Sequence, residues 1–470
     1  MNQDLLAITT LGALKNAGYR TAPVRIEMRN NLLDRLKRGE RTLPGIVGYD
    51  KTVVPEIENA ILAGHHAILL GERGQAKSRI IRSLAGLLDE LVPAVKGCEI
   101  NDDPYAPICK FCRRQLEERG DELEIAWITR EHRYAEKLAT PDVSVADLIG
   151  EIDPIKVAEG RYLADEETIH YGLIPRTNRG IFAINELPDL TEKVQVGLFN
   201  LMEEKDVQIK GYKIRLPVDV VFVASANPED YTSRGRIITP LKDRFDVQIR
   251  THYPKTLEHE IAIMEQECSY PLRPDLPLRV APFLREILAH ITFEARASNE
   301  INQSSGVSVR VTINNFEAVI SNAERRAVML GENEIVPRIT DLPSLYASTA
   351  GKIELEYVGE DKKEEDLVER LINRAVLKVF DHYLKLDDLK SVIGYFGQGW
   401  GVEVSDMAPS TEYLEPLREV PGLREAVERL GPFETPGLMA VASELIFEGL
   451  HLHQKLNKER QGGGRFAYHA

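Results

Sequence analysis

The chain has 470 residues, of which 43% are hydrophobic and 28% charged, a balance typical of folded proteins rather than disordered chains. Its 59 Lys and Arg residues are outnumbered by 74 Asp and Glu residues, and the resulting net charge of −15 disfavours non-specific nucleic-acid binding. No apolar run approaches the ~18 residues of a membrane span, and the N-terminus lacks the basic region of a secretory signal. Four cysteines are too few for a disulfide scaffold. We therefore expect a soluble, cytoplasmic protein of roughly two to four domains.

The hydropathy pattern divides the chain into four parts. Residues 1–44 predict an amphipathic helical segment, and residues 45–254 alternate short apolar runs with longer amphipathic stretches, as α/β domains do. Residues 255–350 predict a helical domain. Residues 351–470 predict a helical extension, with a flexible tail at residues 461–464, where a glutamine precedes three glycines.

Three short runs in the second part are apolar on both faces. They are Ala67–Leu70, Ile181–Ile184 and Val218–Ala224. Strands that are buried on both faces are typical of parallel sheets covered by helices on each side. The sequence therefore predicts an α/β fold with these runs as central strands.

A glycine-containing loop follows the first of these runs and precedes an amphipathic helical stretch that extends to Leu91. The loop consists of Gly71, Glu72, Arg73, Gly74, Gln75, Ala76, Lys77 and Ser78. A strand, such a loop and a helix together form a phosphate-binding loop, because the backbone N–H groups and the helix N-terminus face the phosphates. Lys77 would neutralise the β- and γ-phosphates, and Ser78 would place its hydroxyl on Mg²⁺. Ala76 stands where the motif has its last glycine.

Polar side chains follow the other two strands. The second strand ends in Asn185 and Glu186, and the third runs into Asn227. Glu186 is predicted to polarise the water that attacks the γ-phosphate, and Asn227 to orient that water. Asn185 replaces a usual Asp and could hold a Mg²⁺-bound water, but it brings no charge. We expect its replacement by Asp to preserve or raise Mg²⁺-dependent activity.

Arginines beyond the third strand could stabilise negative charge in the transition state. Arg244 is the candidate arginine finger, acting on a nucleotide held by a neighbouring subunit, with Arg234 and Arg236 as alternatives. Arg310 precedes a predicted helix over Thr312–Met329 and could contact the γ-phosphate from the helical domain.

Three of the cysteines follow the phosphate loop with the spacing C-x10-C-x2-C. They are Cys98, Cys109 and Cys112. Zinc takes four ligands, and either Asp103 or His132 could supply the fourth, although the sequence selects neither. Reduced thiols without any role are the alternative.

As a set, these motifs resemble those of the AAA+ ATPases, and within them the magnesium-chelatase I-subunit and MoxR-like branch with a helix-2 insert. The resemblance covers about residues 44–331 and implies an αβα core with a parallel sheet, followed by a helical lid. It assigns the adenine contact to Ile46 and Val47, Walker A to Gly71–Ser78, Walker B to Asn185 and Glu186, sensor 1 to Asn227, the arginine finger to Arg244 and sensor 2 to Arg310.

Two segments fit the inserts of this branch. Lys156–Leu163 resembles an insert within helix 2, and Val207–Leu216 lies where relatives have a hairpin before sensor 1. The second segment also carries a hairpin signal of its own, since polar and apolar residues alternate around a Lys-Gly pair. In relatives these hairpins face the ring pore or a partner. Hairpins with no contact role are the alternative.

The resemblance implies ATP and Mg²⁺ as ligands and ATP hydrolysis in a homo-oligomeric ring, a hexamer in relatives. It also implies a protein client, often reached through a partner with a von Willebrand factor A domain. One alternative is the ATPase subunit of a magnesium chelatase, which drives Mg²⁺ insertion into a porphyrin. Others are a nucleic-acid motor or transcriptional activator, which the acidic charge disfavours, and an ATP-gated scaffold with weak turnover, which Asn185 suggests.

Overall fold

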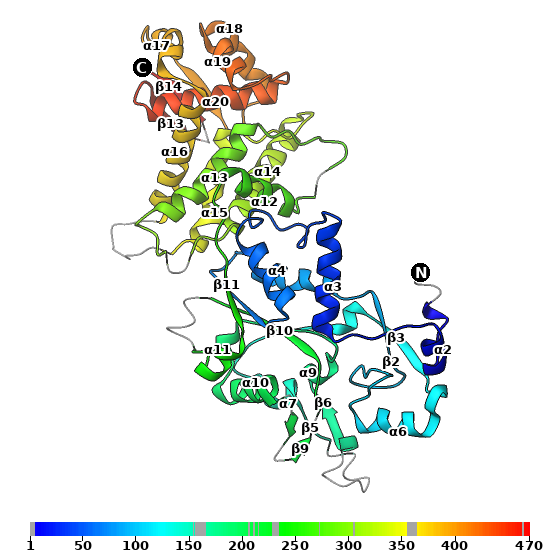
Figure 1. The fold of residues 1–470 in the computed structure, drawn as a ribbon. Helices are drawn as coiled ribbons and strands as arrows, with labels where there is room; N and C mark the ends of the chain where they lie inside the picture. The colour runs from blue at the N-terminus through cyan, green and yellow to red at the C-terminus, as the bar shows by residue number, and fades with distance from the viewer. Residues whose placement is uncertain are drawn as a thin grey trace. The chain divides into compact units, whose positions relative to one another are not determined.

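The computed structural model describes residues 5–153, 155, 166–204, 207–209, 212–214, 216–227, 235–271, 273–303, 306–354, 364–462 and 465–470. The chain, whose ribbon Figure 1 shows, forms two compact units, Met1–His252 and Tyr253–Ala470. Two hydrophobic cores lie in the first unit and one in the second. This division differs from the four parts predicted from hydropathy.

A five-stranded parallel sheet forms the centre of the first unit. Its order is β11-β1-β10-β7-β4, so the three predicted strands are its three central ones. The register aligns Ala67 of β1 with Val223 of β10 and Val247 of β11. The prediction of a parallel sheet is therefore confirmed. The strands are β1 (Ala67–Leu70), β4 (Tyr134–Leu138), β7 (Gly180–Asn185), β10 (Val220–Ala226) and β11 (Val247–Arg250).

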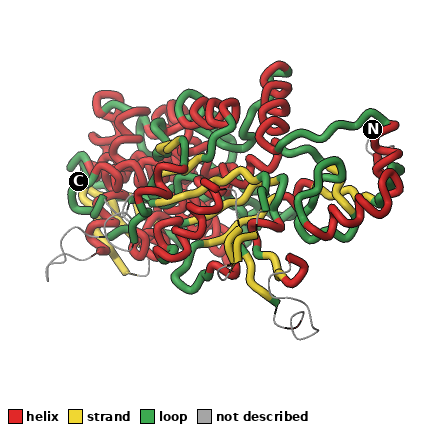
Figure 2. The backbone as a smooth tube through the Cα atoms, turned by 60° about the horizontal axis from the view of Figure 1, so that its bottom comes forward, coloured by secondary structure: helices red, strands yellow, loops and turns green. Residues whose placement is uncertain are grey.

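Helices cover both faces of this sheet, because successive strand residues point to opposite sides. Ile181 and Val223 face one core, whereas Phe182 and Ala224 face the other. Figure 2 shows the strands in yellow among the helices in red. Over the first face lie α3 (Val24–Lys37), α4 (Val53–Ala63) and α5 (Lys77–Leu84); over the second lie α7 (Val145–Leu148), α9 (Leu173–Arg176), α10 (Glu192–Glu204) and α11 (Thr239–Arg244).

The segment after α5 departs from the predicted long helix. That helix was expected to reach Leu91, but α5 ends at Leu84, and β2 (Leu91–Val95) pairs antiparallel with β3 (Ile125–Thr129). A 3-10 turn at Ala85–Leu87 ends the helix, Leu88 is extended, and Pro93 in β2 is tolerated because β2 is an edge strand. Between the two strands lies α6 (Lys110–Arg119). The paired strands β2 and β3, together with α6, form an insert between α5 and β4.

The N-terminal segment is part of the first unit rather than a separate element. Near the start of the chain, α2 (Leu11–Asn16) is anchored to the insert, where the N–H of Leu11 donates to the carbonyl of Leu123. Further on, Glu27 of α3 forms a buried bidentate pair with Arg133, at 2.8 and 2.6 Å. These contacts tie residues 5–37 to the sheet and the insert.

The first unit contains two further antiparallel strand pairs. The predicted hairpin before the third strand is confirmed by the antiparallel pairing of β8 (Val207–Ile209) with β9 (Tyr212–Ile214). The other hairpin pairs β5 (Gly150–Ile152) with β6 (Ile169–Tyr171). The predicted helix-2 insert at residues 156–163 lies between these two strands and outside the described residues.

The second unit is mainly helical and has one continuous core that runs from Met264 to Tyr468. The predicted boundary at residue 350 therefore does not separate two cores. The predicted helix over Thr312–Met329 is confirmed as part of α14. Within the described ranges, every helix of the chain is too short or too polar to serve as a transmembrane segment. The helices are α12 (Leu257–Glu267), α13 (Pro282–Ala297), α14 (Arg310–Leu330), α15 (Tyr346–Thr349), α16 (Glu364–Tyr383), α17 (Lys390–Phe396), α18 (Leu414–Glu419), α19 (Leu423–Leu430) and α20 (Pro436–Leu452).

The prediction of a flexible tail at residues 461–464 is wrong for Gln461 and Gly462, which belong to a strand, and residues 463 and 464 lie outside the described residues. β13 (Asn457–Gly462) and β14 (Arg465–His469) pair antiparallel, and β12 (Val402–Ser405) completes a sheet of order β12-β14-β13. The physical reason is burial, because Tyr468 of β14 is 2% exposed and its hydroxyl donates to Glu448.

Candidate nucleotide-binding site

The phosphate loop lies at the carboxyl end of β1, where ligands of parallel α/β sheets bind. Lys77 is the first residue of α5, and Ala76 before it has left-handed backbone angles, with φ 58° and ψ 15°. This is the conformation that glycine favours, so Ala76 occupies a glycine-type position of the motif. Gly71 is required for a different reason: a Cβ there would lie 1.9 Å from Oγ1 of Thr251.

The ammonium group of Lys77 is buried within the loop and directed to the end of β10. Its Nζ atom donates to the carbonyl oxygens of Gly71 at 2.5 Å and Glu72 at 2.8 Å, and to Oδ1 of Asn227 at 2.6 Å. A lysine in this position places a positive charge where the phosphates of a nucleotide would lie.

Asn227 joins the lysine to the predicted catalytic carboxylate. Its Nδ2 atom donates to Oε2 of Glu186 at 2.7 Å. Glu186 follows β7 in a left-handed conformation, with φ 55° and ψ 48°. The three predicted elements, the loop, the acidic strand end and the polar amide, therefore meet at one edge of the sheet.

Asn185 lies beside the loop serine and beside a carboxylate that the sequence did not reveal. Its Oδ1 atom accepts from the hydroxyls of Ser78 at 3.4 Å and Ser225 at 3.2 Å. Its Nδ2 atom donates to Glu136 of β4, the neighbouring strand. Glu136 also pairs with Arg82 of α5, and this pairing lowers the pKa of the Glu136 carboxyl. A negative charge thus stands next to Asn185, although residue 185 has none.

The sequence did not reveal Glu136 because its strand lacks a continuous apolar run. Tyr134, Ala135, Glu136 and Lys137 are all partly exposed, so they do not form the apolar run that marks the central strands. Only its position could have indicated a role for Glu136. A carboxylate in the strand next to β7 lies near Asn185, which ends β7.

A cavity of about 380 Å³ adjoins the loop on the side of β11. The hydroxyl of Tyr49 donates to the carbonyls of Gln75 at 3.0 Å and His252 at 2.6 Å, and this holds the segment that contains Ile46 and Val47 next to the loop. Ile46 itself is buried in the core, and neither residue is among the described ones that line the cavity. The lining residues are Leu70, Gly71, Glu72, Gln75, Lys242, Gln248, Arg250 and Thr251.

The candidate arginines Arg244 and Arg310 belong to helices rather than to the loop or to the strand ends. Arg244 is the last residue of α11 and forms an ion pair with Glu203 of α10, with 2.6 Å between Nε and Oε2. Arg236 is exposed, and Arg234 lies outside the described residues. Arg310 begins α14 and belongs to the second unit. Their roles stay predictions.

The three cysteines predicted as metal ligands come together in the insert, with Asp102 as a fourth potential ligand. Neither residue named from the sequence is part of this group. The carboxylate of Asp103 accepts the N–H of Tyr105 at 2.9 Å, and the His132 ring pairs with the hydroxyl of Thr129 at 3.1 Å. The sequence could not separate Asp102 from its neighbour, because the turn decides which carboxylate points inward.

The covered parallel sheet, the loop that presents Lys77 and the polar ends of β7 and β10 define an α/β P-loop core. Comparison with curated proteins finds magnesium-chelatase subunits among its relatives. The chain is 27% identical over 229 residues to the magnesium-chelatase 38 kDa subunit of Cereibacter sphaeroides, a match that covers 48% of this chain and 63% of that protein. It is 30% identical over 211 residues to the magnesium-chelatase subunit ChlI of Anabaena variabilis, covering 44% and 58%.

The chain is thus similar in sequence to these magnesium-chelatase subunits, and it spans about three fifths of the length of these relatives. One chain from a solved complex of the magnesium-chelatase subunits BchI and BchD aligns with this protein. The alignment covers 69% of this chain and 97% of that chain, at 19% identity and a TM-score of 0.35. Comparison with models of known protein families gives no match.

Proposed function

We propose that this chain is an AAA+ ATPase of the magnesium-chelatase and MoxR-like type, which hydrolyses ATP to remodel or activate a partner protein. One observation carries the proposal: the Asn227 amide bridges Lys77 and Glu186 at the carboxyl edge of the sheet. A γ-phosphate bound by Lys77 would therefore lie next to a carboxylate and an amide that can position water.

Each residue of the cluster has a chemical task in this proposal. The loop N–H groups and Lys77 bind the phosphates, and Lys77 neutralises the charge that develops on them. Glu186 accepts a hydrogen bond from the attacking water and draws its proton, while Asn227 fixes the orientation of that water.

The residues around Ser78 fit Mg²⁺, which prefers oxygen ligands and keeps several of its waters. Ser78 offers a hydroxyl and Asn185 an amide oxygen. Glu136 adds the negative charge that Asn185 lacks. When bound, the cation would neutralise phosphate charge, and Ser78, Asn185 and Glu136 would hold it through direct or water-mediated contacts.

The proposed assembly is a homo-oligomeric ring. Arg244 reaches the nucleotide of the neighbouring subunit in this assembly, which requires it to leave its ion pair with Glu203. Hexamers occur among AAA+ relatives, and a separate protein with a von Willebrand factor A domain is the proposed partner. The hairpin β8–β9 is the proposed contact with the client. A cytoplasmic location remains a prediction.

A second candidate is the ATPase subunit of a true magnesium chelatase. Its support is the similarity to proteins that carry that name. The two candidates differ in substrate: a chelatase subunit would support ATP-dependent Mg²⁺ insertion into a porphyrin once its partner subunits are added, and a remodeller would not.

The test is a Glu186→Gln variant of the full chain. We expect it to bind ATP with unchanged affinity while phosphate release falls by about 10²-fold or more, since the general base is lost. Glu118→Gln on the exposed face of α6 is the matched control and should hydrolyse ATP normally. Full turnover by the Glu186→Gln chain would refute the proposal, and otherwise its ATP-bound form serves as bait for the client.

A further inference from the structure

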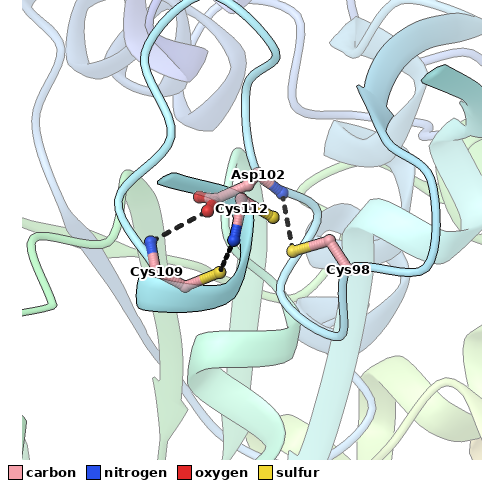
Figure 3. A group of neighbouring side chains, drawn as sticks. All are labelled: Cys98, Asp102, Cys109 and Cys112. Atoms are coloured by element: carbon pink, nitrogen blue, oxygen red, sulfur yellow. Dashed lines mark hydrogen bonds between the residues drawn. The ribbon is translucent and has the colours of Figure 1, made fainter. Parts of the chain in front are cut away.

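The insert between α5 and β4 gathers three thiols and one carboxylate. Cys98 follows β2, Cys109 directly precedes α6, and Cys112 lies in the first turn of that helix. The three Sγ atoms and a carboxylate oxygen of Asp102 all lie within 4.8 Å of one another. Figure 3 shows the four side chains gathered around one spot in the insert. All four cysteines of the chain are free thiols.

This group is enclosed by protein. Asp102 and Cys112 are fully buried, Cys109 is 4% exposed, and Cys98 is half-buried. Acidic groups this close cannot all ionise unless a cation compensates their charge.

The backbone already favours sulfur in its thiolate form. The N–H groups of Ile100 and Asp102 both point at Sγ of Cys98, at 3.4 Å, and the N–H of Cys112 points at Sγ of Cys109, at 3.3 Å. Such donors stabilise negative charge on sulfur, as does the N-terminus of α6 next to Cys109.

The carboxylate of Asp102 is held so that one oxygen remains available. Its Oδ2 atom accepts the N–H groups of Ile108 at 3.1 Å and Cys109 at 2.9 Å. Its Oδ1 atom is buried, and among the described residues no group donates to it. A buried oxygen without a donor is unfavourable, and a coordinated cation would satisfy it.

We propose that Cys98, Asp102, Cys109 and Cys112 bind one Zn²⁺ ion with tetrahedral geometry. Zinc at about 2.3 Å from each sulfur places the sulfurs about 3.8 Å apart, so the observed spread requires only a small contraction. Each thiol releases its proton to solvent when the metal binds.

The site is structural rather than catalytic, because the protein supplies all four ligands and leaves no open position. Ile100, Cys109 and Cys112 belong to the core that also contains Phe182 and Phe222 of the central sheet. The bound ion would thus cross-link residues 98–112 and fix the insert against the ATPase core. This assignment is independent of the proposed ATPase function.

The experiment measures metal in the full chain, purified under reducing conditions from zinc-supplemented cells. We expect about one zinc ion per chain by mass spectrometry of the metal, and about one cobalt ion after exchange. Cobalt should show the intense visible bands of tetrahedral coordination together with a thiolate charge-transfer band. Cys268→Ser, which changes a cysteine outside the group, should leave both results unchanged.

Two variants separate metal loss from misfolding. Cys112→Ser should abolish stoichiometric zinc, but it alters a fully buried position. Cys98→Ser changes the most exposed ligand and should lower zinc affinity by at least about tenfold, while circular dichroism and ATP binding persist. The proposal fails if the wild-type chain takes up neither metal. It also fails if chains that hold no zinc form a disulfide between Cys109 and Cys112 when they are oxidised. It fails as well if Cys98→Ser binds zinc as tightly as the wild type.

Discussion

Lys77 and Asn227 lie 150 positions apart in the sequence, and their side chains are joined by a 2.6 Å hydrogen bond. The bond exists because β1 and β10 are neighbours in the sheet and end at the same edge. A phosphate that binds at Lys77 is therefore in reach of Asn227. The strand order therefore brings the phosphate loop and the polar strand ends together.

Replacing Lys77 by Ala should remove most nucleotide affinity. Charge-assisted hydrogen bonds contribute about 1.5–3 kcal/mol each, so we expect ATP binding to weaken by about 10- to 100-fold or more. Isothermal titration calorimetry with ATP and Mg²⁺ measures this directly. Lys193→Ala, at an exposed position of α10, is the control. Unchanged affinity in Lys77→Ala would rule out the loop as the phosphate site.

Glu136 and Asn185 should share the task of holding Mg²⁺. Glu136→Gln removes the only negative charge of this pair, and we expect the Mg²⁺ concentration for half-maximal ATP hydrolysis to rise by about tenfold. Asn185→Asp should lower that concentration or leave it unchanged.

The combination of the two changes is the decisive measurement. The double variant Asn185→Asp with Glu136→Gln has its negative charge on β7 instead of on the neighbouring strand β4. The Mg²⁺ concentration for half-maximal ATP hydrolysis should therefore return to near the wild-type value. A double variant as impaired as Glu136→Gln alone would show that Glu136 acts only through its ion pair with Arg82.

Arg244→Ala tests action between subunits. The isolated variant should lose about 10³-fold in ATP hydrolysis, the scale of an arginine finger. Mixed rings with Glu186→Gln should recover part of this activity, because each variant supplies what the other lacks. Glu203→Ala frees the guanidinium from its ion pair and should not lower the rate. Full activity of Arg244→Ala would remove this residue from the mechanism.

Two substitutions in the phosphate loop should act in opposite directions. Ala76 has φ 58°, which is unfavourable for an L-residue by about 1–2 kcal/mol, so Ala76→Gly should keep nucleotide affinity and leave the melting temperature unchanged or higher. Gly71→Ala should instead impair both, since its Cβ would clash with Thr251. Differential scanning calorimetry and ATP titration measure the two effects. A lower melting temperature or a weaker ATP affinity in Ala76→Gly would contradict the proposed role of the left-handed backbone at this position.

The buried pair between Glu27 and Arg133 should be important for stability. Removing one partner leaves the other charge uncompensated, so we expect Glu27→Ala to destabilise the first unit by about 3–5 kcal/mol in denaturant unfolding. Glu40→Ala breaks a fully exposed pair with Arg38 and should have no measurable effect. Equal midpoints for the two variants would show that the buried pair is dispensable.

Elements with strong local signals were predictable from the sequence. The three central strands are continuous apolar runs because helices cover both of their faces, and the loop before α5 has a motif with a defined strand and helix on either side. The polar residues that follow these strands could be placed together because parallel strands end at one edge.

Elements that depend on partners distant in sequence were not predictable. β2 and β4 are stabilised by pairing with β3 and β7. The apolar run of β2 contains a proline and could be taken as the end of the preceding helix, and β4 has no continuous apolar run. The C-terminal hairpin depends on β12, which lies more than fifty residues earlier. For the same reason, the parts played by Glu136 and Asp102 emerged only once the backbone had brought them to their partners.

The left-handed backbone of Glu186 has a consequence for protein engineering. An L-residue at φ 55° strains the chain, and glycine would relieve that strain. A library of variants at position 186, ranked by heat resistance alone, would therefore reward glycine and discard the carboxylate. Variants at this position must be selected by their turnover, because thermal stability favours glycine whereas the proposed reaction requires glutamate.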